Sequence, residues 1–209
     1  MRPGPRVEAH PIETESYRIL EERVDLSHLG PCARPVVARV IHASADIEYA
    51  RTMVVDESAV LAGVDAIRAG APVIADVEMV LRGINGTEAC CYLDEIASTP
   101  STGPTRSAQA MALAAGRHPV GAVVVVGCAP TALVEALRMA AEGDFAPALV
   151  VGLPVGFVGA AEAKEAARAS GLRTITNIGE KGGSAVAAAA LNAIVTLSRT
   201  HSALGEDHD

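Results

Sequence analysis

Aromatic side chains are scarce in this sequence, which has three Tyr, two Phe and no Trp among its 209 residues. Half of the residues are nevertheless hydrophobic, so the core must be built from Val, Ala, Leu and Ile. A chain of this length and apolar content can bury a substantial core without disulfides or metals. The composition favours helices packed on a buried parallel sheet over an all-β sandwich.

The sequence also lacks an excess of basic charge and any long apolar run. The formal net charge is -8, which gives no basic face for nucleic acid. No stretch reaches the roughly 20 uninterrupted apolar residues of a membrane span, and the first residues lack an apolar signal core. The cysteines lack zinc-ribbon spacing and no two histidines have metal-ligand spacing. We therefore expect a soluble cytoplasmic protein with reduced, buried cysteines and no metal, nucleic-acid or membrane partner.

Two regimes follow one another along the chain. Residues from about 8 to 70 carry apolar positions at helical spacing and predict N-terminal helices, whereas later residues alternate short apolar runs with Ala-rich helical stretches. The runs that read as strands buried on both faces are Pro72–Ala75, Ala89–Tyr92, Ala122–Val126, Ala148–Val151 and Leu172–Ile175. The alternation predicts an α/β fold, a three-layer α/β/α arrangement with a parallel sheet of about five strands, preceded by N-terminal helices. One domain is expected over residues 1–209, with its body at about 8–198 and flexible ends at 1–7 and 201–209.

The loops that follow these strands are the expected place for a ligand, because open parallel sheets bind ligands beyond their carboxyl ends. Four of them are rich in Gly, Pro, Ser or Thr and open a helix: Ser98–Arg106, Gly127–Thr131, Gly152–Val158 and Asn177–Ser184. Such loops present free backbone N–H groups and the positive end of a helix dipole. Together with Arg106, Lys164 and Lys181 they predict an anion cradle, for phosphate or for a ligand with many carboxylates. None of them matches the P-loop or the dinucleotide fingerprint.

A histidine in the N-terminal regime is the candidate proton-transfer group. Arg39, His42 and Asp46 lie at i, i+3 and i+7 and share one helical stripe. Asp46, four residues after His42, could hydrogen-bond the ring and orient it for acid–base work. The alternative is a histidine on a partly exposed helix flank with a local ion pair.

Several motifs, in order, resemble those of the precorrin-8X methylmutase family. They are His10–Glu13 with Ser16 and Tyr17, Arg39–His42, Asp76–Val80, Thr105–Ser107, Ala129–Leu133, Pro154–Val158, and Lys181–Ser184 with Asn192 and Ala193. The similarity covers about residues 8–198. The chain departs from the family's usual pattern at Cys128, which replaces Asn, at Ala163, which replaces Ser, and at Glu180, which replaces a basic residue.

The resemblance implies a flavodoxin-like homodimer that binds a tetrapyrrole and uses no added cofactor. The family's reaction is an isomerisation in cobalamin biosynthesis, which moves a methyl group from carbon 11 to carbon 12 of precorrin-8X and gives hydrogenobyrinate or its cobalt-containing counterpart. By motif position, His42 would donate or accept the proton. The substrate contacts would be Ser16 and Arg39 and, from motif position and charge, Arg106, Phe157, Lys164, Lys181 and Ser184.

Two other functions fit the same residues. One is a non-catalytic carrier that holds a corrinoid, and the other is an enzyme with a phosphate ligand on the same fold. A tightly bound pigment would not distinguish the carrier from an isomerase, whereas turnover would. Binding of ADP or FMN would favour the phosphate-ligand enzyme.

Overall fold

The computed structural model of the chain describes residues 10–97 and 103–200. The ends at 1–7 and 201–209, which the sequence predicts to be flexible, lie outside the described residues. Five strands form one sheet in the order β1-β5-β4-β3-β2, and these are β1 (Met53–Val55), β2 (Val73–Ala75), β3 (Val123–Val126), β4 (Leu149–Gly152) and β5 (Thr174–Asn177). Strands β2 to β5 are parallel, as predicted.

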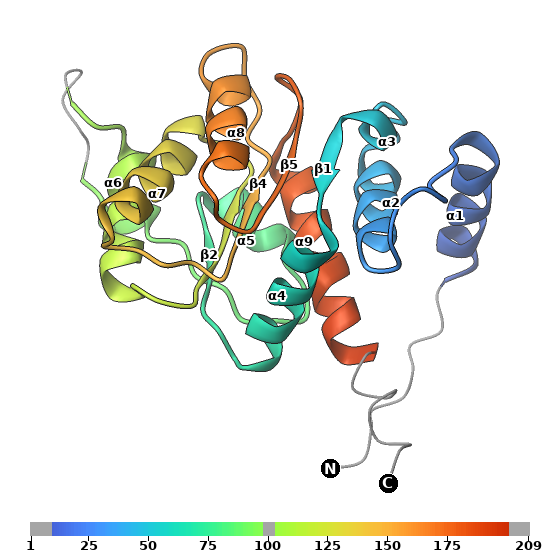
Figure 1. Ribbon diagram of the computed structural model, residues 1–209, viewed down its shortest axis with the longest axis horizontal. Helices are drawn as coiled ribbons and strands as arrows, with labels where there is room; N and C mark the ends of the chain where they lie inside the picture. The colour runs from blue at the N-terminus through green and yellow to red at the C-terminus, as the bar shows by residue number, and fades with distance from the viewer. Residues whose placement is uncertain (1–9, 98–102, 201–209) are drawn as a thin grey trace, which may run out of the picture.

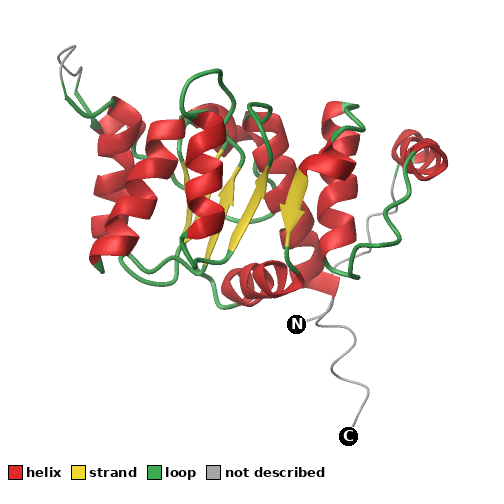
Figure 2. Cartoon of the chain, turned by 45° about the horizontal axis from the view of Figure 1, so that its top comes forward, coloured by secondary structure: helices red, strands yellow, loops and turns green. Residues whose placement is uncertain are grey.

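Helices cover both faces of the sheet and give the predicted three layers (Figures 1 and 2). One face carries α2 (Ala33–Ser44), α4 (Glu57–Arg68), α5 (Glu78–Gly83) and α9 (Ser184–Thr200), and the other carries α6 (Arg106–Arg117), α7 (Pro130–Glu142) and α8 (Ala160–Ala169). The short helix α3 (Tyr49–Thr52) leads into β1, and the 3-10 turn η1 (Leu93–Glu95) precedes α6. Helix α1 (Pro11–Arg23) packs on α2 at the outer side of the molecule (Figure 1).

The core is aliphatic, as the composition predicts. In β3, the four valines are completely buried and alternate between the two faces: Val123 and Val125 pack toward α9, whereas Val124 and Val126 pack toward α6 and α7. Alanines fill the matching helix faces, so helices and sheet approach closely. Across residues 10–97 and 103–200, no helix combines the length and the apolar character needed to cross a membrane.

The predicted strand over Ala89–Tyr92 is wrong as a strand but lies where a strand would be. Cys90 makes a single parallel bridge with Ile74, donating its N–H to the Val73 carbonyl at 2.9 Å and accepting from the Ala75 N–H at 2.8 Å. The pairing stops after this one bridge because the chain then turns into η1, so no strand forms. If the bridge counts as a strand position, the parallel part has the 2-1-3-4-5 order of flavodoxin-like folds. Their switch point then falls between the carboxyl ends of β2 and β3.

Strand β1 was not predicted and makes the sheet mixed rather than parallel. Met53–Val55 pairs antiparallel with β5 at the edge of the sheet and is only half-buried. Three residues directly after a helix give no period that a sequence could reveal. The edge strand follows from the turn after α2, which brings the chain back beside β5.

Candidate active site

His42 lies in the last turn of α2 and is held by two neighbours from α1. The Ser16 Oγ lies 2.9 Å from His42 Nδ1, and the Tyr17 ring stacks on the imidazole with centroids 4.8 Å apart and planes within 8°. Glu13, Ser16, Tyr17 and Leu20 fall at i, i+3, i+4 and i+7, so one face of α1 turns toward α2. The ring is therefore fixed in position and in plane. Among the described residues, none hydrogen-bonds to its Nε2.

The predicted bond between Asp46 and His42 is wrong. Helix α2 ends at Ser44, and Ala45 takes a left-handed conformation with φ 53°, so Asp46 leaves the helical stripe. Its carboxylate instead accepts from the Glu48 N–H at 3.0 Å and pairs with Lys181 at 2.7 Å. Ser16, which lies 26 residues away in sequence, takes the orienting position on His42.

Arg39 precedes His42 by one helical turn and also contacts α1. Its Nη1 forms an ion pair with Glu13 and donates to the Tyr17 hydroxyl at 3.3 Å. The side chain is half-buried, and it lines the same recess as His42. A cation is thereby held beside the imidazole at the surface of a recess.

Two recesses meet at His42. One, of about 310 Å³, lies between α2, α5 and α9 and is lined by Arg39, His42, Ala43, Gly83, Ala185, Ala188, Ala189 and Asn192. The other, of about 110 Å³, lies between α1 and α2 and includes Ser16, Ile19 and Ile41. The wall that α9 offers to the larger recess consists mostly of alanine methyl groups. Such a wall is flat and apolar, which suits the face of a planar ring.

A buried carboxylate binds the backbone N–H groups of the loop after β3. The buried Asp76 carboxylate accepts hydrogen bonds from the N–H groups of Gly127 at 3.1 Å, Cys128 at 2.9 Å and Ala129 at 2.8 Å. Burial raises the pKa of Asp76, while the three N–H donors act against that rise. The expectation that this loop presents free N–H groups is therefore wrong, because a side chain of the protein already occupies them.

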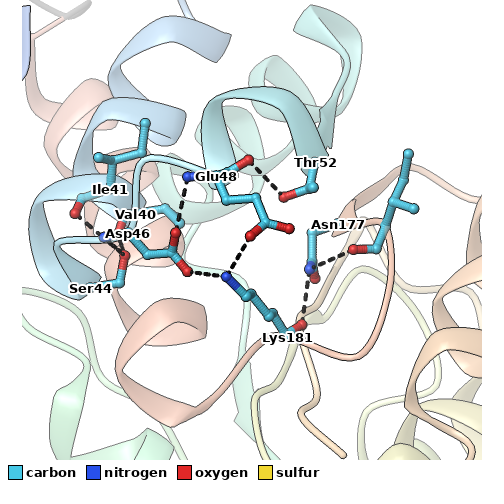
Figure 3. A network of polar contacts seen from close by, with 9 residues as sticks. Val40, Ile41, Ser44, Asp46, Glu48, Thr52, Asn177 and Lys181 are labelled. Carbon is cyan, nitrogen blue, oxygen red and sulfur yellow. Dashed lines mark hydrogen bonds and ion pairs between the residues drawn. The ribbon is translucent and has the colours of Figure 1, made fainter. Parts of the chain in front are cut away.

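Lys181, in the loop between β5 and α9, bridges to the turn after α2. Its ammonium lies 2.7 Å from Asp46 and 2.6 Å from Glu48, as Figure 3 shows. These two hydrogen bonds raise the pKa of Lys181, and the bond from Lys181 lowers the pKa of Asp46. The bridge ties the start of α9 to the helix that carries His42.

Comparison with known proteins matches this arrangement to one family. A family model described as precorrin-8X methylmutase matches residues 11–197. The cobalt-precorrin-8 methylmutase of Priestia megaterium is 41% identical and covers 92% of this chain and 89% of its own, and the precorrin-8X methylmutase of a Sinorhizobium species is 38% identical and covers 88% and 92%. The structure of the precorrin-8X methylmutase from Thermus thermophilus superposes with a TM-score of 0.82 at 37% identity, covering 91% of this chain and 96% of that one.

The chain belongs to the precorrin-8X methylmutase family. Its members are isomerases of cobalamin biosynthesis, as the sequence resemblance predicted. Ser16, Arg39 and His42, which the family pattern assigns to substrate and proton, lie together. Ser184 begins α9 and stands beside Gly127, where its Cα would lie 2.9 Å from an added Cβ.

The other residues expected from the methylmutase pattern are more widely spread. Arg106 begins α6 on the opposite face of the sheet and donates to the Leu93 carbonyl at 3.0 Å. Phe157 is 91% exposed in the loop after β4. Their contacts with substrate stay predictions. Lys164 lies inside the protein, where its ammonium holds a backbone carbonyl, and this place suits an indirect role better than contact with substrate.

The departures from the methylmutase pattern occupy dissimilar places. Cys128 uses its backbone N–H on Asp76 and leaves its thiol exposed, so the expectation of buried cysteines fails at this position. Ala163 lies on the buried face of α8, and Glu180 is exposed. Within the described residues, no group of three or more His, Cys, Asp or Glu side chains could hold a metal ion.

The residues that sequence reasoning missed are Tyr17 as a stacking partner, Glu13 as the partner of Arg39, and Asp76 as the anchor of the β3–α7 loop. The first two could have been found from the helical face that they share with Ser16. The Asp76 contacts join residues about 50 positions apart, so only the fold brings them together.

Proposed function

We propose that this protein moves a methyl group from carbon 11 to carbon 12 of precorrin-8X, giving hydrogenobyrinate. The observation that carries the proposal is His42, held by Ser16 and Tyr17 at the edge of a recess with an alanine wall. A sigmatropic methyl shift needs no nucleophile from the protein. It needs the macrocycle held in place, water excluded, and the conjugated ring polarised by a proton.

In this mechanism His42 delivers a proton to the conjugated ring as the methyl group migrates, and recovers it afterwards. The bond from carbon 11 to the methyl carbon breaks while the bond from carbon 12 forms, so the mass does not change. Ser16 at Nδ1 and the Tyr17 stack fix the imidazole, and Nε2 is left to exchange the proton.

Substrate binding relies on local cations because the chain as a whole carries a charge of -8. Tetrapyrrole precursors of this kind carry acetate and propionate arms around the rim. Arg39 stands beside the recess, and the amino end of α9 at Ser184 adds the positive end of a helix dipole. Arg106, Phe157 and Lys181 are proposed to contact outer parts of the substrate.

A homodimer in the cytoplasm completes the proposal. The recess of about 310 Å³ is at the lower limit for a drug-sized ligand, so it holds only part of a tetrapyrrole. Phe157 and Val158 expose apolar side chains that a second copy or the substrate would cover. Light scattering on the purified chain tests this part: a mass near twice that of the 21.3 kDa monomer supports it and a monomer at micromolar concentration contradicts it.

The phosphate-ligand alternative is disfavoured by Asp76. A nucleotide at the switch point would need the N–H groups of Gly127, Cys128 and Ala129, and there it would meet a carboxylate that already binds them. A thermal-shift screen with ADP and FMN checks this: neither is expected to raise the melting temperature, and a clear shift with either would favour the alternative.

The direct test is to mix the protein in excess with precorrin-8X and follow the visible spectrum and the mass. A spectral change at constant mass is expected. A bound but unchanged pigment would favour the carrier, provided that cobalt-precorrin-8 offered in a parallel experiment is also unchanged. Conversion of either form establishes the isomerase and shows which substrate the protein takes.

A further inference from the structure

Lys164 is a buried lysine that the proposed chemistry does not use. Its side chain is 0% exposed, on the inner face of α8. The ammonium donates to Asn177 Oδ1 at 3.0 Å and to the Lys181 carbonyl oxygen at 2.6 Å, and both acceptors are uncharged. Burying an ammonium against neutral acceptors is costly, and an apolar side chain of similar volume would serve the core better. The contacts that the ammonium makes therefore point to a function beyond packing.

Those contacts hold the loop between β5 and α9. The Lys181 carbonyl that Lys164 binds also accepts from Asn177 Nδ2 at 2.9 Å, and the Gly183 N–H donates to the Leu153 carbonyl at 2.9 Å. Gly182 has no room for a Cβ, which would lie 2.5 Å from the Pro154 carbonyl oxygen. The loop is thus pressed against the end of β4 and fastened from behind by Lys164.

Two parts of the site depend on this loop. Its last residue leads into α9, whose Ala185, Ala188 and Ala189 form the wall of the recess beside His42. Its Lys181 side chain reaches Asp46 and Glu48 in the turn after α2, the helix that carries His42 (Figure 3). Helices α2 and α9 pack directly on each other, and the loop adds a second link by fixing where α9 begins relative to the turn after α2.

We propose that Lys164 is a positioning residue for the methyl shift, holding the β5–α9 loop from inside so that the α9 wall and His42 face the same substrate. The inference rests on the proposed function. It replaces direct contact between Lys164 and the substrate by a structural link, from α8 through the loop to α9 and α2.

The link has a built-in pH dependence. Burial, aided by Arg168 on the same helix and opposed by Glu180 in the loop, lowers the pKa of Lys164 to about 8. Loss of the proton weakens both hydrogen bonds, since a charged donor binds about twice as strongly as a neutral one. Substrate binding is then expected to weaken as the pH rises through about 8.

Charged groups near Lys164 are paired with one another or keep their charge, so the loss of the Lys164 proton is the change expected there near pH 8. On α7, which packs against α8, Arg138 pairs with Glu135 and Glu142. The pKa of Lys181 is raised by Asp46 and Glu48, so that side chain keeps its charge in the same range.

Folding stability should change in the opposite direction. The ordinary pKa of lysine is 10.5, so between about 8 and 10.5 the unfolded chain holds a proton on Lys164 that the folded chain has lost. The contribution of this group to stability therefore rises with pH over that range. If Lys164 acted only through folding stability, substrate affinity would rise with pH together with stability. If Lys164 positions the loop, substrate affinity should fall with pH while stability rises.

The experiment measures KM and kcat for precorrin-8X, and unfolding by urea, from pH 6.5 to 9.5. In the wild-type protein KM is expected to rise about tenfold with a midpoint near pH 8, with a smaller change in kcat. Lys164→Met should show a KM raised about tenfold already at pH 7 and flat with pH. Glu165→Gln, an exposed change on the same helix, is the matched control and should behave as wild type.

Two results would overturn the proposal: a wild-type KM that stays constant across pH 8, or a Lys164→Met protein that keeps the wild-type KM at pH 7. If Lys164→Met does not fold, the wild-type protein decides alone, by whether KM rises while urea stability does not fall. A wild-type protein that converts no precorrin-8X at any pH would instead overturn the proposed function, and binding of hydrogenobyrinate with the same pH midpoint would still support the positioning of the loop.

Discussion

The carboxyl edge of the sheet and the α1–α2 pair use their polar groups in opposite ways. At the sheet edge, Asp76 accepts hydrogen bonds from the N–H groups after β3. The ammonium groups of Lys164 and Lys181 likewise bind oxygen atoms of the same chain. On the helix pair, Ser16 and Tyr17 hold His42 at the junction of two recesses. In the proposed mechanism, the edge where α/β proteins usually bind ligands serves mainly as a rigid frame, and the proton-transfer group is carried by the helices that precede the sheet.

The largest effect on the frame is expected from Asp76→Ala. It leaves three backbone donors without their acceptor, and we expect a loss of about 3 kcal/mol or more in the free energy of unfolding. Urea unfolding of the full chain measures it. Asp76→Asn, which keeps an acceptor oxygen, should lose clearly less, and equal losses for the two variants would contradict the account of this loop.

On the helix pair, Arg39→Ala should weaken binding of hydrogenobyrinate by about 1.5–3 kcal/mol, the scale of a charge-assisted contact. Arg106→Ala, at the sheet edge on the other face, should have a smaller effect. Titration of the pigment with each variant makes the comparison. If Arg106→Ala weakens pigment binding as much as Arg39→Ala does, the sheet edge and the α1–α2 pair do not differ in their contribution to binding.

Gly182→Ala tests how tightly the frame is packed. The new methyl group would overlap the Leu153 carbonyl and displace the β5–α9 loop, so we expect a stability loss of about 1–3 kcal/mol together with a raised KM. Gly116→Ala in α6 is the control, because nothing lies within 4 Å of the added Cβ. It should be neutral or stabilise by up to about 1 kcal/mol. A harmless Gly182→Ala would show that the loop is looser than described.

Tyr17→Leu should have the smallest effect, since it removes the stack on His42 but not the proton donor itself. We expect kcat to fall about fivefold, which corresponds to about 1 kcal/mol for an aromatic pair. Tyr17→Phe keeps the stack and should stay within about twofold of wild type. The order of the two variants, measured by single-turnover rates, distinguishes stacking from the hydroxyl contact with Arg39.

Most of the frame could be predicted from the sequence because its signals are local. Four of the five predicted apolar runs became strands, and the Ala-rich stretches that alternate with them became helices. The fifth run, around Cys90, has the place of a strand but only one bridge. Strand β1 was invisible because its three residues owe their pairing to the turn after α2 rather than to a pattern of their own.

The candidate site residues stay predictions, and the structure corrects one contact that was expected among them, between Asp46 and His42. Ser16 came from motif resemblance, and Arg39 and His42 came from it and from their shared helical stripe. The Asp46 contact required α2 to continue to Asp46, two residues beyond its end at Ser44. The contact of Lys164 with substrate, inferred from motif position and charge, stays a prediction, although Ala160, Ala163, Lys164 and Ala167 share the buried spacing of α8. That spacing was the available signal for a buried lysine. Contacts between distant segments, such as that of Ser16 with His42, need the fold itself.

The measurement that tests the central claim most directly is the single-turnover rate of His42→Ala on precorrin-8X, beside His118→Gln as a histidine control away from the recess. The account predicts a rate at least 100-fold slower for His42→Ala, with hydrogenobyrinate affinity kept within about fivefold, and a near wild-type rate for His118→Gln. A His42→Ala protein that binds the pigment and converts it within about threefold of the wild-type rate would contradict the claim that the helix pair carries the chemistry.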